Sequence, residues 1–190
     1  GLGDVYKRQY HAMDIGERLA IVPGWEDYRT DRIRIVMDPG MAFGTGTHHT
    51  TSMCMEYLEE IITPQAEVFD VGTGSGILSI AAAKLGAKSI VAVDIDANAV
   101  RIAKENIAGN GLSEVIAVKE GDLLHGTEGK ADVIIANIIA DIIIMLLPDV
   151  AQKLKADGKF LASGIIEERE DDIKQAAAAS GLKVISTRHK

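Results

Sequence analysis

The stretch that decides the fold is Val68-Phe69-Asp70-Val71-Gly72-Thr73-Gly74-Ser75-Gly76-Ile77. Apolar residues typical of a strand run into three glycines at alternate positions, and an apolar helical pattern follows. Glycine adopts positive φ without strain and lets a ligand approach the backbone without meeting a Cβ atom. A strand, a tight glycine turn and a helix in this order are typical of a doubly wound α/β sheet, which binds ligands at the carboxyl ends of its strands.

Downstream of this stretch, strand and helix patterns alternate to the end of the chain. Strands are expected at Val68–Val71, Ser89–Val93, Val115–Lys119, Asp132–Ala136, Lys159–Ser163 and Leu182–Ser186, and helices at Ile77–Leu85, Ala97–Ala108, Ala140–Leu154 and Glu167–Ser180. Such alternation predicts right-handed βαβ units in an α/β, Rossmann-like fold, with a mostly parallel sheet and helices on both faces.

Upstream, two segments alternate apolar and polar residues and predict half-buried strands at Arg18–Val22 and Arg32–Met37. A glycine-rich segment, Asp38–Thr51, leads into a helix expected over Thr50–Ile62, with Thr50 or Thr51 as its N-cap. His48 and His49 do not suggest a metal site, because adjacent histidines do not share a helix face. No metal is expected.

The composition limits the classes of function. The 190 residues fit one ordinary domain, and the net charge of −8 disfavours binding to nucleic acid through its phosphates. The single cysteine, Cys54, fits a reducing compartment, and the first 20 residues lack the apolar core of a signal peptide. The most apolar stretch, Val133–Leu147, is shorter than the roughly 18–20 residues of a membrane span. We therefore expect a cytoplasmic protein.

The glycine spacing G-x-G-x-G differs from that of other nucleotide-binding loops. A dinucleotide fingerprint, G-x-G-x-x-G/A, would end on Ile77 or on Ser79, and neither residue fits. A P-loop would need Gly-Lys-Ser/Thr, which does not follow. The spacing resembles the first motif of class I S-adenosylmethionine-dependent methyltransferases.

Three polar residues follow successive predicted strands. Asp94 lies about 20 residues beyond the glycines, where an acid can accept both hydroxyls of a ribose. The alternatives for Asp94 are an exposed loop acid or a helix N-cap, a role that Asp96 fits better. Asp122 lies where such methyltransferases often contact the adenine amino group, although a turn aspartate is an equal alternative. Asn137 could accept N–H bonds from a substrate amine or act as a helix N-cap.

Several segments together resemble one family, the PrmA-type methyltransferases of the eleventh large-subunit ribosomal protein. They are Asp38–His48 with Thr50-Thr51, Asp70–Leu78, Asp94–Asp96, Ala136–Ile138 and Ser163–Ile165, and the match runs from about Tyr10 to the end. The resemblance implies S-adenosylmethionine as cofactor and Asn137 as the catalytic residue. The implied cofactor-binding set is Phe43, Gly44, Thr51, Gly72, Gly74, Gly76, Asp94, Asp122 and Asn137.

The resemblance also implies a reaction and a division of the chain. Methyl groups would pass to lysine and N-terminal amines of a basic ribosomal protein, a partner that the acidic charge fits. We expect a monomer without direct nucleic-acid or membrane contacts. Residues 1–9 are expected to be a disordered or foreign leader, 10–37 a linker with short strands, and 38–190 the catalytic domain. The family's N-terminal recognition domain and last C-terminal strand are expected to be missing.

Other functions remain open at this point. A class I methyltransferase could instead act on a protein glutamine, an RNA base or a small molecule. An Asn-Pro-Pro-Tyr sequence at Asn137 would favour such a substrate, but Ile138 and Ile139 follow Asn137. A nicotinamide-dinucleotide oxidoreductase is disfavoured by the glycine spacing. A non-catalytic binding module is the third alternative.

Overall fold

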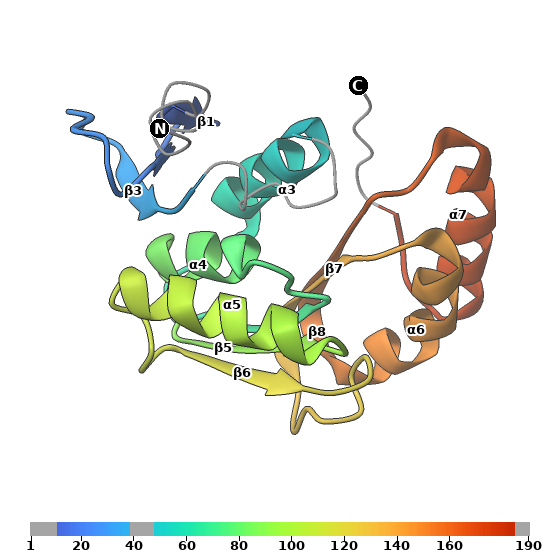
Figure 1. Cartoon of the computed structure of the whole chain (residues 1–190). Coiled ribbons are helices and arrows are strands. Elements are labelled where there is room, and N and C mark those ends of the chain that lie inside the picture. Colours follow the sequence, from blue (N-terminus) through green and yellow to red (C-terminus); the bar gives the residue numbers. More distant parts are fainter. Residues whose placement is uncertain (1–10, 39–47, 185–190) are drawn as a thin grey trace.

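The computed structural model describes residues 11–38 and 48–184, which form two sheets and the helices around them (Figure 1). The smaller sheet has the order β1-β2-β3 and the larger the order β6-β5-β4-β7-β8. The strands are β1 (Met13–Ile15), β2 (Leu19–Val22), β3 (Ile33–Val36), β4 (Glu67–Val71), β5 (Ser89–Asp94), β6 (Ile116–Glu120), β7 (Ala131–Asn137) and β8 (Leu154–Ser163). The helices are α3 (His48–Ile61), α4 (Ile77–Lys84), α5 (Ala97–Gly109), α6 (Ala140–Lys153), the 3-10 turn η1 (Glu167–Arg169) and α7 (Glu170–Ala179).

All four strand pairs of the larger sheet are parallel. From β4 the chain adds β5 and then β6 on one side, and it returns to add β7 and then β8 on the other. The strand order therefore reverses between β4 and β7. In open α/β sheets, ligands bind outside the carboxyl ends of the strands at such a reversal. The predicted Rossmann-like fold is confirmed.

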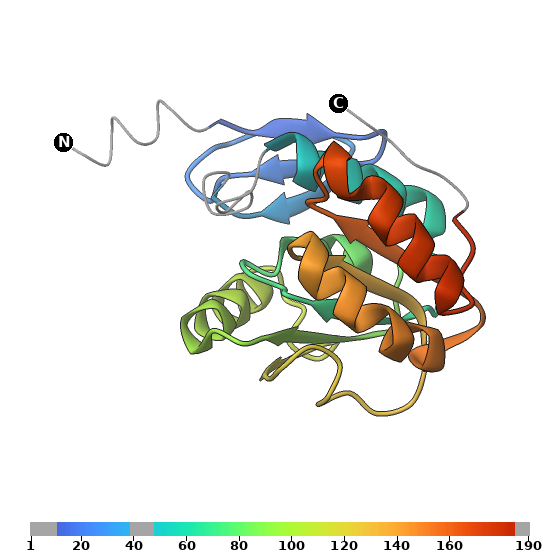
Figure 2. The same cartoon turned by 90° about the vertical axis from the view of Figure 1, so that its right-hand side faces the viewer.

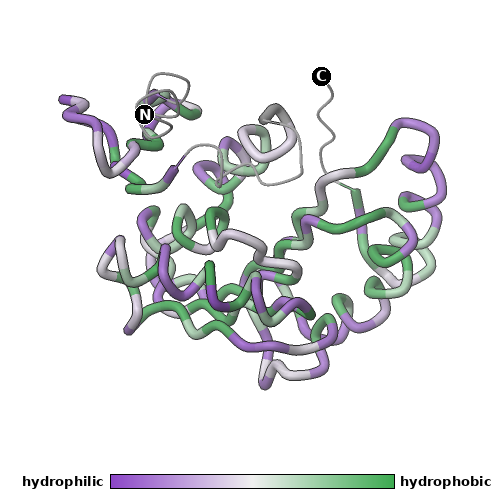
Figure 3. The backbone as a smooth tube through the Cα atoms, viewed as in Figure 1, coloured by the Kyte–Doolittle hydropathy of each residue, from purple (hydrophilic) through white to green (hydrophobic). Residues whose placement is uncertain are grey.

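Two apolar layers hold the larger sheet between helices. Val68, Val133 and Ile135 point into a cluster with residues of α3, α4 and α5. Their neighbours in sequence, such as Phe69 and Ile134, point into a second cluster with residues of α6. The two views show these helices on opposite sides of the sheet (Figures 1 and 2). Burial on both faces explains why the central strands β4, β5 and β7 are mostly apolar, whereas the outer strands β6 and β8 carry more charged and exposed residues. The hydropathy colouring of the backbone follows this pattern (Figure 3).

The smaller sheet is fastened to the helices by two side chains. Glu59 of α3 accepts hydrogen bonds from the backbone N–H groups of Glu17 and Arg18. Asn110, at the end of α5, bonds both the N–H and the C=O of Val36. These bonds place β1–β3 beside α3 and α5, on the same side of the larger sheet.

Three details differ from the sequence expectations in this part of the chain. Strand β2 is buried at every position, not half-buried, because it lies between β1 and β3 and also packs on the core. Strand β1 was not predicted, since three residues are too few for a periodic signal. Helix α3 begins at His48, so Thr50 and Thr51 lie in its first turn and are not its N-cap.

Two further differences concern the C-terminal part. Strand β8 begins at Leu154, five positions before the predicted start, because Leu154 pairs with Ala131 ahead of a register shift. The predicted strand Leu182–Ser186 does not form over its described part. Leu182 instead donates its N–H to the carbonyl of Ala177 and closes α7. Residues 185 and 186 lie outside the described residues, as does the predicted leader 1–9.

None of the helices within residues 11–38 and 48–184 combines the length and apolarity needed to cross a bilayer.

Candidate functional site

A cavity of about 410 Å³ opens at the carboxyl edge of the larger sheet, beside the point where the strand order reverses. Small-ligand sites range over roughly 300–1,000 Å³, so this volume suits a nucleoside-sized molecule. Residues from the ends of four strands share its lining. They are Val71 and Gly72 at the end of β4, Val93–Ile95 at the end of β5, Gly121–Leu123 after β6, and Asn137–Ile139 with Ile142 at and beyond the end of β7.

The glycine loop between β4 and α4 is held by its own backbone hydrogen bonds. The N–H groups of Gly72 and Thr73 both donate to the Val93 carbonyl, at 2.8 and 3.1 Å. Gly74 donates its N–H to the Asp94 carboxylate at 2.9 Å, and Gly76 donates to the Thr73 carbonyl. A phosphate-binding loop needs amides directed at the ligand. Because these four amides are bonded within the protein, the loop is not built as a phosphate cradle.

Gly72, Gly74 and Gly76 were predicted together as site residues, but the structure favours glycine at each of them for a different reason. Gly72 has φ 72°, and an added Cβ atom would lie 2.7 Å from Ile138 Cγ2. Gly76 has φ 87° and packs against Ala103 of α5, where a Cβ atom would make contacts of 3.4–3.6 Å. Gly74 has φ 55° and open space around it. Of the three, only Gly72 lines the cavity.

Asp94 ends β5 with its carboxylate at the cavity. Its Oδ2 accepts from Gly74 N–H, and its Oδ1 accepts from Asp96 N–H at 3.0 Å. An ionised carboxylate offers about four acceptor positions, so about two remain, one on each oxygen. That arrangement matches two adjacent hydroxyls. Asp94 is not a helix N-cap, because Asp96 caps α5 by accepting from Asn98 N–H.

Asp122 lies on the loop after β6 and is exposed. Its carbonyl accepts from His125 N–H, so it opens a turn, and it also lines the cavity. Lys153 of α6 anchors this loop by donating to the carbonyls of Leu124 and Thr127, at 3.1 and 2.7 Å. The sequence does not predict this anchor, because it joins residues almost 30 positions apart.

Asn137 ends β7 on the opposite side of the cavity from Asp94. Its Oδ1 accepts from the Ser163 hydroxyl at 2.9 Å. Asn137 is not the cap of α6, whose N-cap is Ile139 without a side-chain hydrogen bond. The half-buried amide therefore has the partner that its position requires.

A buried polar cluster joins β4, the glycine loop and α4. Oδ2 of Asp70 accepts from the hydroxyls of Thr73 and Ser79, at 2.9 and 2.6 Å. Oδ1 of Asp70 is fully buried and has no partner among the described residues. Burial raises the pKa of the Asp70 carboxyl, and the two hydroxyl hydrogen bonds oppose that shift. Asp70 belongs to the glycine motif, but the sequence alone does not indicate this supporting role.

The remaining predicted site residues lie apart from this cavity or beyond the described structure. Thr51 is buried in α3, one helical turn before Cys54, and does not line the cavity. Phe43 and Gly44 lie outside the described residues.

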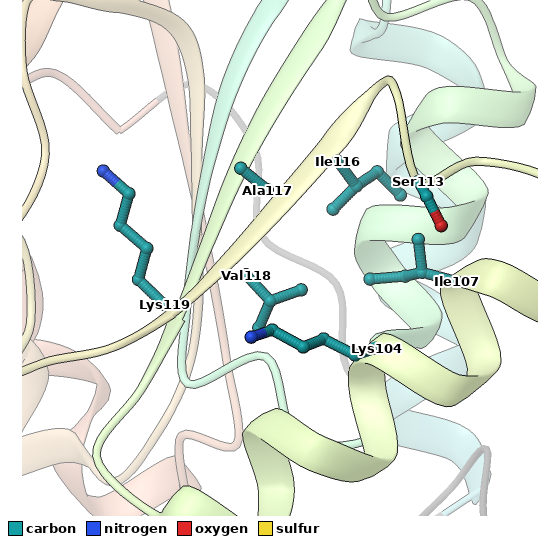
Figure 4. A pocket seen from close by; sticks show the side chains of 7 residues that line it. All are labelled: Lys104, Ile107, Ser113, Ile116, Ala117, Val118 and Lys119. Atoms are coloured by element: carbon teal, nitrogen blue, oxygen red, sulfur yellow. The ribbon is translucent and has the colours of Figure 1, made fainter.

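A second hollow, of about 420 Å³, lies along the outer edge of β6 (Figure 4). The side chains of Ile116 and Val118 face α5 there, while Ala117 and Lys119 point to the other side of the strand. Lysine on an edge strand is a common means of preventing pairing with another chain. This hollow gathers no set of side chains from several strand ends, so we place the candidate site at the carboxyl edge.

The fold is the Rossmann-like fold of class I methyltransferases. It combines a parallel sheet whose strand order reverses between β4 and β7, a glycine loop after β4, and polar residues at successive strand ends. A solved structure from Geobacter metallireducens, a precorrin-6y C5,15-methyltransferase, shares this fold at a TM-score of 0.62 with 14% identity, covering 73% of each chain.

The particular family follows from closer comparisons. The model of the ribosomal protein L11 methyltransferase (PrmA) family matches residues 4–190, and the chain belongs to this family. The ribosomal protein L11 methyltransferase of Caldanaerobacter subterraneus subsp. tengcongensis is 54% identical over 176 residues, which cover 92% of this chain and 57% of that protein. The corresponding protein of Desulforamulus reducens is 49% identical, with coverage of 95% and 59%. The chain therefore spans less than two thirds of the length of these relatives.

A solved structure of the same family supports the assignment. The crystal structure of ribosomal protein L11 methylase from Lactobacillus delbrueckii subsp. bulgaricus superposes with a TM-score of 0.87 at 42% identity. The superposition covers 95% of this chain and 94% of that one.

Proposed function

We propose that this chain carries the methyl-transfer site of an S-adenosylmethionine-dependent protein methyltransferase, with lysine and N-terminal amines of ribosomal protein L11 as substrates. One observation carries the proposal. The ends of four neighbouring strands bring Gly72, Asp94, Asp122 and Asn137 to one cavity of about 410 Å³. Relatives with about half of their residues identical are named for methylation of L11. We place the cofactor-binding unit in residues 38–190.

The residues of the cavity fit the parts of S-adenosylmethionine. The two remaining acceptor positions of Asp94 suit the hydroxyls of a ribose, which carries no phosphate in this cofactor. Ile95, Ile138 and Ile139 give the cavity an apolar lining suited to an adenine ring. Gly72 leaves room that a Cβ atom would take from the ligand or from Ile138. Asp122 lies at the margin, where it could accept from the adenine amino group.

The bound cofactor supplies a sulfonium whose methyl carbon is open to attack by an amine. The protein therefore needs no nucleophile of its own, and its task is to align the reactants and exclude water. Asn137 lies across the cavity from Asp94, and its carbonyl oxygen can accept an N–H bond of the amine. That bond would hold the amine with its lone pair pointing away from Asn137, free to attack.

The amine must lose a proton before it attacks. For a lysine with the reference pKa of about 10.4, deprotonation at pH 7 costs about 4.6 kcal/mol. An apolar site disfavours the charged ammonium, and a nearby cation lowers the amine pKa further. Ile138 and Ile139 beside Asn137 provide such apolar surroundings. Repeated methylation requires the amine to rotate, which a single acceptor such as Asn137 permits.

The loop geometry disfavours the dinucleotide alternative. In that alternative, loop amides would hold a pyrophosphate. Here the amides of Gly72, Thr73 and Gly74 are bonded to Val93 and Asp94.

A ribosomal protein substrate also suits the net charge of −8, because ribosomal proteins are typically basic.

Two experiments test the proposal. Calorimetric titration should show binding of S-adenosylmethionine and no binding of NAD; the opposite pattern would refute the cofactor assignment. Mass spectrometry of L11 incubated with the chain and S-adenosylmethionine should show mass increases of one or more methyl groups on amines. Methylation of RNA or of a protein glutamine in place of L11 would refute the substrate assignment.

A further inference from the structure

Ser163 ends β8 directly opposite Asn137, which ends β7, in the parallel register of the two strands. Its hydroxyl donates to Asn137 Oδ1 at 2.9 Å. The Asn137 side chain ends in a planar amide, and a half-turn of that amide exchanges its acceptor oxygen with its donor nitrogen. The bond from Ser163 therefore bears on which end of the amide is presented to the cavity.

The chemistry of the acceptor gives this hydrogen bond its direction. An amide oxygen can only accept, so the Ser163 hydroxyl supplies the proton to Asn137 Oδ1.

The backbone beyond β8 passes close to the amide. Gly164 has φ 79°, and a Cβ atom added there would lie 3.6 Å from Asn137 Oδ1 and 3.5 Å from the carbonyl of Ile138. The chain therefore turns close to the amide immediately after Ser163. Asn137 lies between this turn and the cavity.

We propose that Ser163 is a positioning residue that fixes the Asn137 amide with its oxygen ready to accept from the substrate amine. The oxygen has two lone pairs, of which Ser163 uses one and leaves the other for the amine. In the reversed amide, the NH₂ group would face the amine, and two donors would meet. The role in methyl transfer rests on the proposed function, whereas the orientation of the amide is a property of the chain itself.

The first test is independent of activity. In nuclear magnetic resonance spectra of the ¹⁵N-labelled chain, the side-chain NH₂ signals of Asn137 are assigned by their loss in Asn137→Asp. Ser163→Ala should shift or broaden these signals, and Ser163→Thr, which keeps the hydroxyl, should restore them. If Ser163→Ala does not fold, Ser163→Cys replaces it, since a thiol keeps the volume with a weaker donor. Unchanged Asn137 signals would overturn the proposal.

The second test separates positioning from cofactor binding. With L11 as methyl acceptor, Ser163→Ala should lower kcat about tenfold, the equivalent of one ordinary hydrogen bond. The Kd for S-adenosylmethionine should stay within about twofold, and Ser163→Thr should recover kcat. Ser89→Ala is the matched control, because Ser89 is an exposed serine at the amino end of β5, whereas the candidate site lies at the carboxyl ends of the strands.

The outcomes distinguish this inference from the proposed function. If the unaltered chain fails to bind S-adenosylmethionine, the proposed function fails, and the resonance experiment still decides the orientation of Asn137. If the unaltered chain methylates L11 and Ser163→Ala keeps its kcat, only the positioning role of Ser163 is overturned. A loss confined to cofactor affinity would overturn it as well.

Discussion

A single carboxylate at the end of β5 organises the candidate site. Asp94 accepts from the backbone of the glycine loop and from Asp96 N–H, and it still has acceptor positions facing the cavity. The same side chain can therefore hold the loop in shape and bind a ligand. This double role explains why the glycine loop and the acid occur together in the sequence.

Replacement of this carboxylate is the most direct test at the scale of a residue. We expect Asp94→Ala to weaken S-adenosylmethionine binding by about 1–3 kcal/mol, because the ribose hydroxyls would lose their acceptor. Isothermal titration calorimetry measures the change. Asp31 lies at an exposed bend, well before Asp94 in the sequence. Asp31→Ala should therefore bind S-adenosylmethionine as tightly as the unaltered protein does. Equal affinities for Asp94→Ala and the unaltered protein would remove the ribose assignment.

The buried carboxyl of Asp70 gives stability a pH dependence. Burial raises its pKa above the ordinary value of 3.8, so the folded chain keeps a proton that the unfolded chain has lost. The free energy of unfolding therefore falls as pH rises from about 3.8 through the folded-state pKa, by up to about 1.4 kcal/mol per pH unit.

Asp70→Asn lacks this titration and keeps an acceptor for Thr73 and Ser79. Its stability relative to the unaltered chain should therefore increase with pH across the same window. Urea unfolding at several pH values measures the difference. A difference that is constant or decreases with pH would contradict the assigned burial cost.

At the scale of an element, the loop between β4 and α4 offers a matched pair of glycines. Both have positive φ, so alanine at either position costs about 1–2 kcal/mol. Gly72→Ala should lower the free energy of unfolding by about 1–3 kcal/mol more than Gly74→Ala does, because its Cβ atom would lie 2.7 Å from Ile138 Cγ2. Chemical denaturation measures both. Adding Ile138→Ala should recover part of the extra loss, and equal losses at the two glycines would argue against the close approach.

The elements that the sequence predicted well are those that combine an apolar pattern with a turn signal. The strand, loop and helix around Gly72 and the capped helix after Asp96 lie within a residue or two of their predicted bounds. The poorly predicted elements depend on pairings that apolar patterns do not specify. Strand β8 starts early because Leu154 pairs with the distant Ala131. The expected strand at Leu182 gives way to a local hydrogen bond, from Leu182 N–H to the Ala177 carbonyl, that closes α7.

The candidate site shows the same division. Parallel strands end at one edge, so the sequence could place Gly72, Asp94, Asp122 and Asn137 near one another before any coordinates were known. The hydrogen bond between Ser163 and Asn137 depends on the register of β7 and β8, which apolar patterns do not specify. The anchor of the Asp122 loop by Lys153 was not predicted either, because it joins residues almost 30 positions apart.

At the scale of the whole molecule, binding at the reversal of the strand order should stabilise the fold. A ligand that binds only the folded chain, at 100 times its Kd, adds about 2.7 kcal/mol to the free energy of unfolding. S-adenosylmethionine should produce this gain in urea unfolding, whereas NAD at the same concentration should not. Asp94→Ala should need a higher concentration of S-adenosylmethionine for the same gain. Equal stabilisation by both compounds would indicate non-specific binding.

The central claim is that a nucleoside sulfonium binds across the carboxyl edge of the sheet, between Asp94 and Asn137. A crystal structure of the chain with S-adenosylhomocysteine, the product of methyl transfer, tests it most directly. We expect both ribose hydroxyls within hydrogen-bonding distance of the Asp94 carboxylate and the sulfur on the side facing Asn137. Ligand density in the hollow along β6, or a ribose away from Asp94, would contradict the account.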